Sequence, residues 1–485
     1  MLNPPSDSND CYVARSSERW PHRIPKGKMF NKEVYFKYPI YEMYGAAVLE
    51  QNGFEVSAID AVQEGLTLEQ TTDRVKSINP DLVIVQTITP TIKWDLTVAK
   101  KIKDELGCHI NLIGSHVTIF HEQILKDNPF VDSVTRGEWD YILRDLAMCL
   151  EKGKSLSDVD GLSYRDGNQV KCNKSRPPIT NLDELPYPAR HLLDPSKYLL
   201  AHYTYKPELL IATSRGCPFH CIFCLWTKTF YDGKIVLRDP KKVVDEVEYV
   251  IKNYGAKEIY FDDDLFNISE KRVLDICQEL IDRKVNIPWI AELRVTPMSK
   301  NMLRQMKKAG CIKIMFGVES GSQKILDIAK KDYKVESIRE TFRLCYDEGI
   351  RTHATFAFGL PGETKETIRE TIKFAKSLRA DTIQCSIATP YPGTEYYDMA
   401  KKNGWLKSDN WSNFDGGLHG VVSFGDLTTT DIENAINRTY WEFYSDLKAW
   451  PRRLYRIKIT DFSRYFGLAK AFIRRFGNSG IPKKI

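Results

Sequence analysis

The sequence predicts an α/β fold in three parts: a doubly wound, Rossmann-like parallel sheet, a partial (β/α)6 barrel of the TIM type, and a helical C-terminal region. Strand and helix patterns alternate over residues 40–150 and again over 209–390, which is typical of parallel sheets. A proline-rich connector separates the two runs. We therefore expect a Rossmann-like domain at 1–150, a linker with a hairpin at 151–205, a barrel at 206–395 and a helical region at 396–485.

Composition narrows the class of protein. The 485 residues are enough for about three domains. The 70 Lys and Arg against 64 Asp and Glu give a net charge of +6, too little to argue for a nucleic-acid partner. The eleven cysteines follow no disulfide-like spacing and no signal peptide precedes them, so we expect a reducing cytoplasm. No apolar run approaches the roughly 18 residues that cross a bilayer.

The N-terminal part reads as a helix over 40–51 and strands over 54–59, 81–85 and 109–113. Ligands of such sheets bind at the carboxyl ends of the strands. The loops after the second and third strands therefore hold candidate ligand contacts, although ordinary turn and helix-cap chemistry explains the same residue types. These candidates are Thr87, Gly114, Ser115, His116 and Thr118.

The connector contains a predicted hairpin over 162–170 that turns through Asp166-Gly167-Asn168. The proline-rich segments at 176–178 and 185–188 follow it. Because proline restricts the conformations of a chain, we expect an ordered linker that holds the two halves at a fixed distance.

The second run begins with a short strand at 210–213, followed by a helix that starts at Asp239-Pro240 and ends at Gly255. Five more strands are predicted at 258–261, 287–292, 312–318, 352–358 and 382–388. A polar or glycine-rich loop follows each strand, and this shared register favours a functional site over isolated turns. The loops are Asp262-Asp263-Asp264, Arg294, Glu319-Ser320-Gly321, Gly359 to Glu363, and Pro392-Gly393-Thr394.

Three thiols follow the first strand of this run: Cys217, Cys221 and Cys224. Thiolates favour iron-sulfur clusters, zinc or copper(I). Structural zinc and ordinary four-iron clusters take four protein ligands, so three cysteines indicate an open metal position. A non-catalytic zinc protein that adds His220 as a ligand is the remote alternative. Zinc sites usually use two separated ligand pairs, unlike this spacing.

Cys217-x-x-x-Cys221-x-x-Cys224, with an aromatic residue before the last cysteine, resembles the radical S-adenosylmethionine (SAM) motif, and the similarity extends over about 209–400. The resemblance implies that the three cysteines hold a [4Fe-4S] cluster whose fourth iron chelates SAM, and that a 5′-deoxyadenosyl radical is formed. Asp-Asp-Asp stands where many relatives have Gly-Gly-Glu. The family pattern assigns Phe223 to the adenine, Asp262 to Asp264 to the amino group, Arg294 to the carboxylate, Glu319 and Ser320 to the ribose, and Gly359 to Glu363 to the adenine.

The N-terminal part resembles the cobalamin-binding domain that precedes many radical SAM enzymes. The resemblance rests on Asn3-Pro4-Pro5, the loop over 113–118 and Arg136-Gly137-Glu138. It implies cobalamin contacts from the candidates named above and from Glu138. The Asp-x-His-x-x-Gly signature is missing, so His116 is expected to contact the cofactor tail or to act behind it rather than to bind cobalt. Only Met1 and Leu2 precede Asn3, which leaves the first strand in doubt.

These resemblances imply cobalamin-dependent methylation of an unactivated carbon of a small, apolar or lipid-like substrate, as in relatives of the magnesium-protoporphyrin cyclase and hopanoid-modifying type. Radical ring closure or carbon-carbon bond formation is the alternative. An electron donor of the flavodoxin or ferredoxin type is expected.

After residue 395 a capping box at Thr430 to Glu433 predicts a helix, and a basic, aromatic tail follows Pro451. Such a tail either lies on an anionic membrane at the inner face or packs on the barrel.

Overall fold

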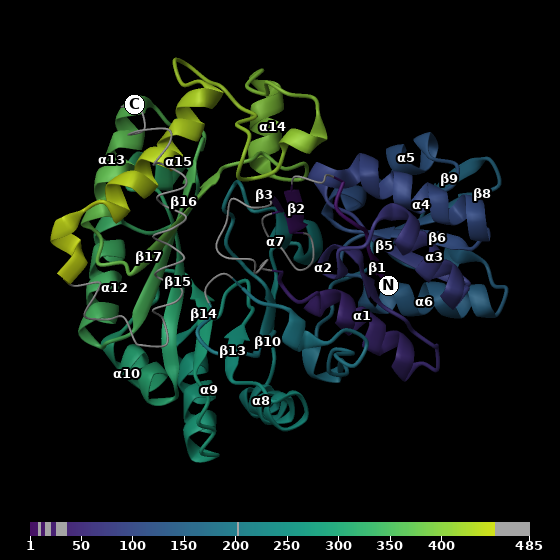
Figure 1. The fold of residues 1–485 in the computed structure, drawn as a ribbon, viewed down its shortest axis with the longest axis horizontal. Coiled ribbons are helices and arrows are strands. Elements are labelled where there is room, and N and C mark those ends of the chain that lie inside the picture. Colours follow the sequence, from purple (N-terminus) through teal and green to yellow (C-terminus); the bar gives the residue numbers. More distant parts are fainter. Residues whose placement is uncertain (8–10, 15–20, 26–35, 201–202, 452–485) are drawn as a thin grey trace.

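The computed structural model describes residues 1–7, 11–14, 21–25, 36–200 and 203–451. Two sheets lie side by side, the N-terminal one built before residue 173 and the second built from residue 208 onward (Figure 1). The basic, aromatic tail expected after Pro451 lies outside the described residues. No helix in the described ranges is both long enough and apolar enough to cross a membrane.

The first sheet has seven strands in the order β4-β1-β5-β6-β7-β8-β9. Its first five strands pair in parallel, and the connector hairpin β8–β9 extends the sheet with antiparallel pairs. The strand expected over 54–59 is limited to two residues, and a two-residue strand precedes Pro4. The strands are β1 (Leu2–Asn3), β4 (Ile59–Asp60), β5 (Leu82–Gln86), β6 (His109–Ile113), β7 (Ser133–Thr135), β8 (Leu162–Asp166) and β9 (Gln169–Cys172).

Helices cover both faces of this sheet, because its strands carry apolar residues that point to one face and apolar residues that point to the other. Ile84 and Ile113 pack with α1 and α6, whereas Val85 and Leu112 pack in the separate core of the opposite face. The doubly wound prediction is thereby confirmed. The helices are α1 (Ile40–Gln51), α2 (Ala61–Glu64), α3 (Leu68–Ile78), α4 (Ile92–Leu106), α5 (Ser115–Asp127) and α6 (Asp140–Glu151).

The second sheet has six parallel strands in sequential order, as predicted for a partial barrel. Residues on one face of its strands, such as Leu209, Ile259 and Phe316, lie in the largest apolar core of the described chain. Residues on the other face, such as Leu210 and Ile290, pack in the core that contains α1 and α6. The strands are β10 (Glu208–Ile211), β13 (Glu258–Phe261), β14 (Trp289–Leu293), β15 (Cys311–Glu319), β16 (Arg351–Phe358) and β17 (Thr382–Ile387).

Helices alternate with these strands. The apolar stripe predicted for α8 is buried at Val243, Val244, Val247 and Val250, and Asp239 caps its start. The helices are α7 (Leu225–Tyr231), α8 (Pro240–Tyr254), α9 (Glu270–Asp282), α10 (Lys300–Lys308), α11 (Gln323–Ile328), α12 (Val335–Asp347), α13 (Lys365–Ser377), α14 (Glu395–Lys402) and α15 (Thr429–Tyr444). Two antiparallel ribbons complete the described structure: β2 (Cys11–Ala14) with β3 (His22–Pro25), and β11 (Ser214–Gly216) with β12 (Ile235–Leu237).

Helix α15 closes the outer edge of the second sheet (Figure 1). Its capping box is formed by Thr428 and Asp431, two residues before the predicted one, because Thr428 is the residue with extended backbone at the helix start. The hydroxyl of Tyr440 accepts a hydrogen bond of 2.9 Å from the Cys385 N–H of β17. The helix thus satisfies backbone donors that an edge strand would otherwise expose.

Candidate active site

Aspartates at the end of β13 hold the segment that leads into the cysteine loop. Asp263 accepts hydrogen bonds from the backbone N–H groups of Thr213 at 2.6 Å and Ser214 at 3.1 Å. Asp264 accepts one of 2.7 Å from the N–H of Gly216, directly before the first cysteine. Because the carboxyl ends of β10 and β13 lie at the same edge, neighbouring strands fix the start of the loop.

The backbone at Gly216 requires glycine. Its φ is 84°, and a Cβ atom there would lie 2.0 Å from the carbonyl oxygen of Lys234. This close approach lets the ribbon β11–β12 pass directly behind Cys217. The loop therefore turns sharply where the thiols begin.

The three thiols of the loop are partly buried. Burial raises the pKa of Cys217 to about 12 and also raises the pKa of Cys224, whose Sγ lies 3.4 Å from the hydroxyl oxygen of Thr227. The Sγ of Cys221 lies 3.9 Å from Nη1 of Arg294. The neutral thiols of Cys217 and Cys224 are favoured in this environment, so a metal would have to displace their protons on binding.

Two cationic side chains border the loop. The guanidinium of Arg294, after β14, lies 3.6 Å from the ring centroid of Phe219. The Nζ atom of Lys331 lies 5.7 Å from the ring centroid of Phe223 and 3.0 Å from Oε1 of Glu319. Burial is the largest influence and lowers the pKa of Lys331, but the Glu319 carboxylate together with Tyr333 and Cys221 holds this pKa above its usual value. Both cations favour an anionic group in the loop.

The two residues after β15 differ in what they contact. Glu319 has a left-handed backbone with a φ of 65° and pairs with Lys331 beside the loop. Ser320 is fully buried: its hydroxyl lies 3.0 Å from that of Thr371 on α13 and accepts a hydrogen bond from the Ser322 N–H. The Ser320 side chain is thus held by α13. We keep only Glu319 of this pair as a candidate for the ribose.

The glycine-rich loop after β16 is closed by its own glutamate. The N–H of Gly359 donates a 2.5 Å hydrogen bond to Oε2 of Glu363, and the Gly359 carbonyl accepts one from the Tyr396 hydroxyl. Glu363 is 2% exposed, and its Oε1 has no hydrogen-bond partner among the described residues. Burial raises the pKa of Glu363 to about 8. The buried Glu363 carboxylate therefore holds the loop in shape. The groups of this loop that remain for a ligand are those of its backbone.

The aspartates predicted to bind an amino group have partners within the protein. Oδ1 of Asp262 pairs with Nζ of Lys37 at 2.8 Å, with both side chains buried. The Asp262 carbonyl accepts a hydrogen bond from the Tyr41 hydroxyl of α1. Asp264 accepts its hydrogen bond from Gly216. These contacts join the end of β13 to the N-terminal part and to the cysteine loop.

Four of the predicted cobalamin contacts lie at one edge of the first sheet. The N–H and hydroxyl of Thr87 both donate to the carbonyl of Ile113, at 2.9 and 2.8 Å. A Cβ atom on Gly114 would lie 2.0 Å from the Thr87 carbonyl oxygen, so the loops after β5 and β6 are in direct backbone contact. Thr118 bonds the Gly114 carbonyl at 2.8 Å, and Ser115 begins α5.

His116 lies inside this edge. Its Nδ1 atom is 3.2 Å from the hydroxyl oxygen of Thr89, and its ring centroid is 5.3 Å from that of Trp411 and 4.9 Å from that of Phe120. Burial lowers the pKa of His116 to about 3, so the ring is neutral. Trp411 belongs to a 3-10 turn (Trp411–Asn413) after the barrel, which therefore reaches back to the first sheet.

Glu138 lies in the loop after β7 and contacts the segment before the cysteine loop. Nη1 of Arg215, in β11, lies 2.7 Å from Oε1 of Glu138 and 2.8 Å from Oδ2 of Asp140. The other Glu138 oxygen accepts a hydrogen bond from the Ile179 N–H at 2.8 Å. The Arg215 guanidinium also lies 4.8 Å from the ring centroid of Tyr44. Both oxygens of Glu138 have partners within the protein, and the N–H of the preceding Gly137 donates a 3.3 Å hydrogen bond to the Thr118 hydroxyl, so this loop lies beside the other predicted cobalamin contacts. A cobalamin contact by Glu138 stays a prediction.

Sequence reasoning missed three residues of this site: Arg215, Lys331 and Trp411. Arg215 carried a signal, since it is the one charged residue between the apolar strand that ends at Ile211 and the first cysteine. Lys331 and Trp411 carried none, because they approach the site from distant loops.

Both sheets of this chain lie in regions that are similar to known protein families. Residues 211–375 match the model of the radical SAM superfamily, and residues 38–147 match that of the B12 binding domain. A protein of Pyrococcus horikoshii described as an uncharacterized methyltransferase is 32% identical over 411 residues, which cover 84% of this chain and 87% of the relative. The chain belongs to the radical SAM superfamily. It is a member with a B12-binding domain.

Other radical SAM relatives differ in the reaction that their names give. The anaerobic magnesium-protoporphyrin IX monomethyl ester cyclase of Rubrivivax gelatinosus is 32% identical over 370 residues, covering 74% of this chain and 65% of the relative. The solved structure of TsrM, a radical SAM methyltransferase of Kitasatospora setae, aligns with a TM-score of 0.63 at 16% identity and 87% coverage of both chains. The homologues show that this chain is an enzyme of the methyltransferase or cyclase type.

The two domains imply a [4Fe-4S] cluster, SAM and cobalamin as cofactors. The loop fits a cluster better than a single ion. Among the described residues, the three loop thiols do not all come within 4.8 Å of one another, whereas sulfurs on one tetrahedral zinc lie about 3.8 Å apart. A cluster with one iron for each thiol allows the wider spacing.

Proposed function

We propose that this radical SAM enzyme methylates an unactivated carbon of a small, apolar substrate. The observation that carries the proposal is the placement of the cysteine loop at the carboxyl end of β10, bordered by the loops of four other barrel strands and by the N-terminal domain. Cys217, Cys221 and Cys224 would hold a [4Fe-4S] cluster, which would supply the electron for the cleavage of SAM, and a bound cobalamin would supply the methyl group.

The chain's own residues position the ligand. Arg294 is placed to pair the carboxylate of SAM, since its guanidinium already lies beside the Cys221 sulfur. Glu319 is the candidate for the ribose, with Lys331 orienting its carboxylate. The loop from Gly359 to Glu363 offers backbone groups to the adenine, and Phe223 packs at its side. Asp264 acts indirectly by holding Gly216 and so the first thiol.

On the cobalamin side, the proposed contacts are Thr87, Gly114, Ser115 and Thr118. The packing of Thr87 against Gly114 gives a rigid backbone edge to which a flat cofactor can dock. His116 acts through Thr89, because its ring is enclosed. Trp411, from the turn after the barrel, packs on His116 at this edge and would help to exclude water from a reactive carbon radical.

Two groups of relatives leave two reactions open. The bacteriochlorophyllide d C-8(2)-methyltransferase of Chlorobaculum tepidum, 24% identical, supports methyl transfer to an apolar ring system. The cyclases, at 32% and 28% identity, support ring closure as the second candidate.

Transfer of label from methyl-labelled SAM tests the proposal. We expect labelled product from anaerobic turnover with cobalamin, a low-potential flavodoxin or ferredoxin as reductant, and extracts of apolar metabolites as substrate. Product that forms without label would exclude methylation and favour cyclisation. Iron and sulfide analysis of the reconstituted chain separates both from a zinc protein: stoichiometric zinc without sulfide would overturn the enzyme proposal.

A further inference from the structure

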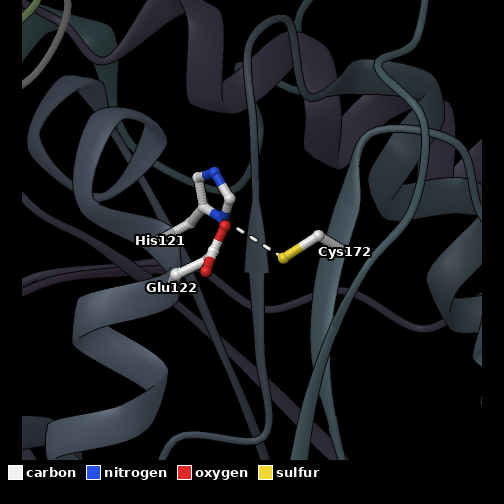
Figure 2. Close-up of side chains that lie close together, drawn as sticks. All are labelled: His121, Glu122 and Cys172. Atoms are coloured by element: carbon white, nitrogen blue, oxygen red, sulfur yellow. Dashed lines mark hydrogen bonds between the residues drawn. The ribbon is translucent and has the colours of Figure 1, made fainter.

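A second group of metal-binding side chains lies at the outer edge of the first sheet, where β9 is the last strand (Figure 1). His121 and Glu122 come from α5, and Cys172 is the last residue of β9. One ligand atom from each lies within 4.8 Å of the other two, which holds for no other such group among the described residues. Figure 2 shows the three side chains converging on one point.

The separation of the soft ligands matches one tetrahedral ion. Nδ1 of His121 lies 3.6 Å from Sγ of Cys172. Zinc bonds of about 2.3 Å to sulfur and about 2.0–2.1 Å to nitrogen, at a tetrahedral angle, place these two atoms about 3.6 Å apart. The ligands therefore need little movement to bind an ion.

A break in α5 brings these residues together. Phe120 has non-helical angles, with φ −103° and ψ 24°, directly before His121. Neighbouring residues of a regular helix point about 100° apart. The break changes this relation and allows two consecutive side chains to approach β9. The hydroxyl oxygen of Ser163, in β8, lies 3.0 Å from Nδ1 of His121, a contact that an ion bound to the same nitrogen would replace.

The charges and the exposure of the group suit a divalent cation. Glu122 and Cys172 are exposed and His121 is partly exposed, so an ion can enter from solvent. One thiolate and one carboxylate neutralise two positive charges. The Arg136 guanidinium, which donates to the Asn173 carbonyl, attracts the same two anions and would compete with the ion for them.

We propose that His121, Glu122 and Cys172 form a site for one thiophilic divalent cation, best matched by zinc, with water completing the coordination. Exposed acidic side chains alone are common without an ion, whereas this group adds a thiol and an imidazole whose 3.6 Å hydrogen bond already has the separation of two zinc ligands. The ion would tie α5 to the hairpin β8–β9. This site is separate from the cysteine loop and does not depend on the proposed methyl transfer.

Zinc retention by the full chain tests the proposal. The chain is reconstituted anaerobically so that its cluster cysteines are occupied, then exposed to zinc chloride and passed through a desalting column. We expect one tightly bound zinc for each wild-type chain. Cys172→Ser and His121→Gln should lower the affinity at least about tenfold, because even substitutions behind metal ligands cost roughly 10–100-fold. Glu122→Gln should lower it less.

Matched controls are Cys149→Ser, a partly exposed cysteine on α6, and Glu151→Gln at the end of the same helix. Both should retain zinc like the wild type. Amide hydrogen exchange gives a second readout: zinc should slow exchange over 162–172 in the wild type and leave the Cys172→Ser chain unchanged. Equal zinc retention by Cys172→Ser, His121→Gln and the wild type, or no retention by the wild type, would overturn the site.

Discussion

Glu363 is the residue at which burial and charge conflict most clearly. Its pKa is raised from 4.5 to about 8 by burial, so the folded chain holds a proton that the unfolded chain releases between these values. The free energy of unfolding should therefore fall as pH rises from about 4.5 to about 8, by up to roughly 1.4 kcal/mol for each pH unit.

Glu363→Gln should flatten this dependence, because an amide keeps the acceptor for the Gly359 N–H and does not titrate. Urea denaturation of both chains between pH 5 and pH 8 checks it. Glu366→Gln, on the exposed side of α13, is the control and should keep the wild-type slope. Parallel curves for wild type and Glu363→Gln would contradict the assignment.

At the scale of elements, α13 lies so close to the loop after β15 that only glycine fits at Gly321. A Cβ atom there would lie 2.4 Å from Cβ of Phe374 and 2.9 Å from the Thr371 Cα. Gly321→Ala should destabilise the chain by about 1–3 kcal/mol through overpacking. Gly417→Ala is the control, since the nearest atom to its added Cβ lies 3.9 Å away. Thermal denaturation should separate them, and equal midpoints would refute the packing argument.

The edge strand β17 depends on hydroxyl groups from α15. Tyr440→Phe should leave the Cys385 N–H without its acceptor, at a cost of about 1–3 kcal/mol for a buried donor. Tyr444→Phe should cost less, because its contact to the Ile383 N–H is longer at 3.3 Å. Hydrogen exchange of the Cys385 amide measures the effect directly. Unchanged protection in Tyr440→Phe would show that another group caps the strand.

At the scale of the whole molecule, Arg215 joins the two sheets directly behind the cysteine loop. Arg215→Gln leaves the carboxylates of Glu138 and Asp140 buried without their cation, which should destabilise the chain by about 3–5 kcal/mol. Chemical denaturation measures the loss. Arg304→Gln breaks an exposed pair with Glu348 and should change stability by less than about 1 kcal/mol. Similar losses for the two variants would argue against an interdomain role for Arg215.

Much of the fold could be predicted because its signals are local. The strand at His109–Ile113, the helix at Ile40–Gln51 and the cap at Asp239 follow from periodicity and from caps within a few residues. The shorter strand at Ile59–Asp60 could not, since its length depends on pairing with β1 at a distant point of the chain.

By itself the sequence determined the order of strands and helices and showed which three cysteines form the metal-binding motif. Both conclusions rest on the spacing of residues along the chain. Only the tertiary structure decided which polar and charged groups meet. It placed Glu138 on Arg215, Ser320 on Thr371 and Lys331 beside the cysteine loop. Pairing of buried charges depends on distances between segments far apart in sequence, and the Coulomb energy that selects partners exists only once those segments are packed.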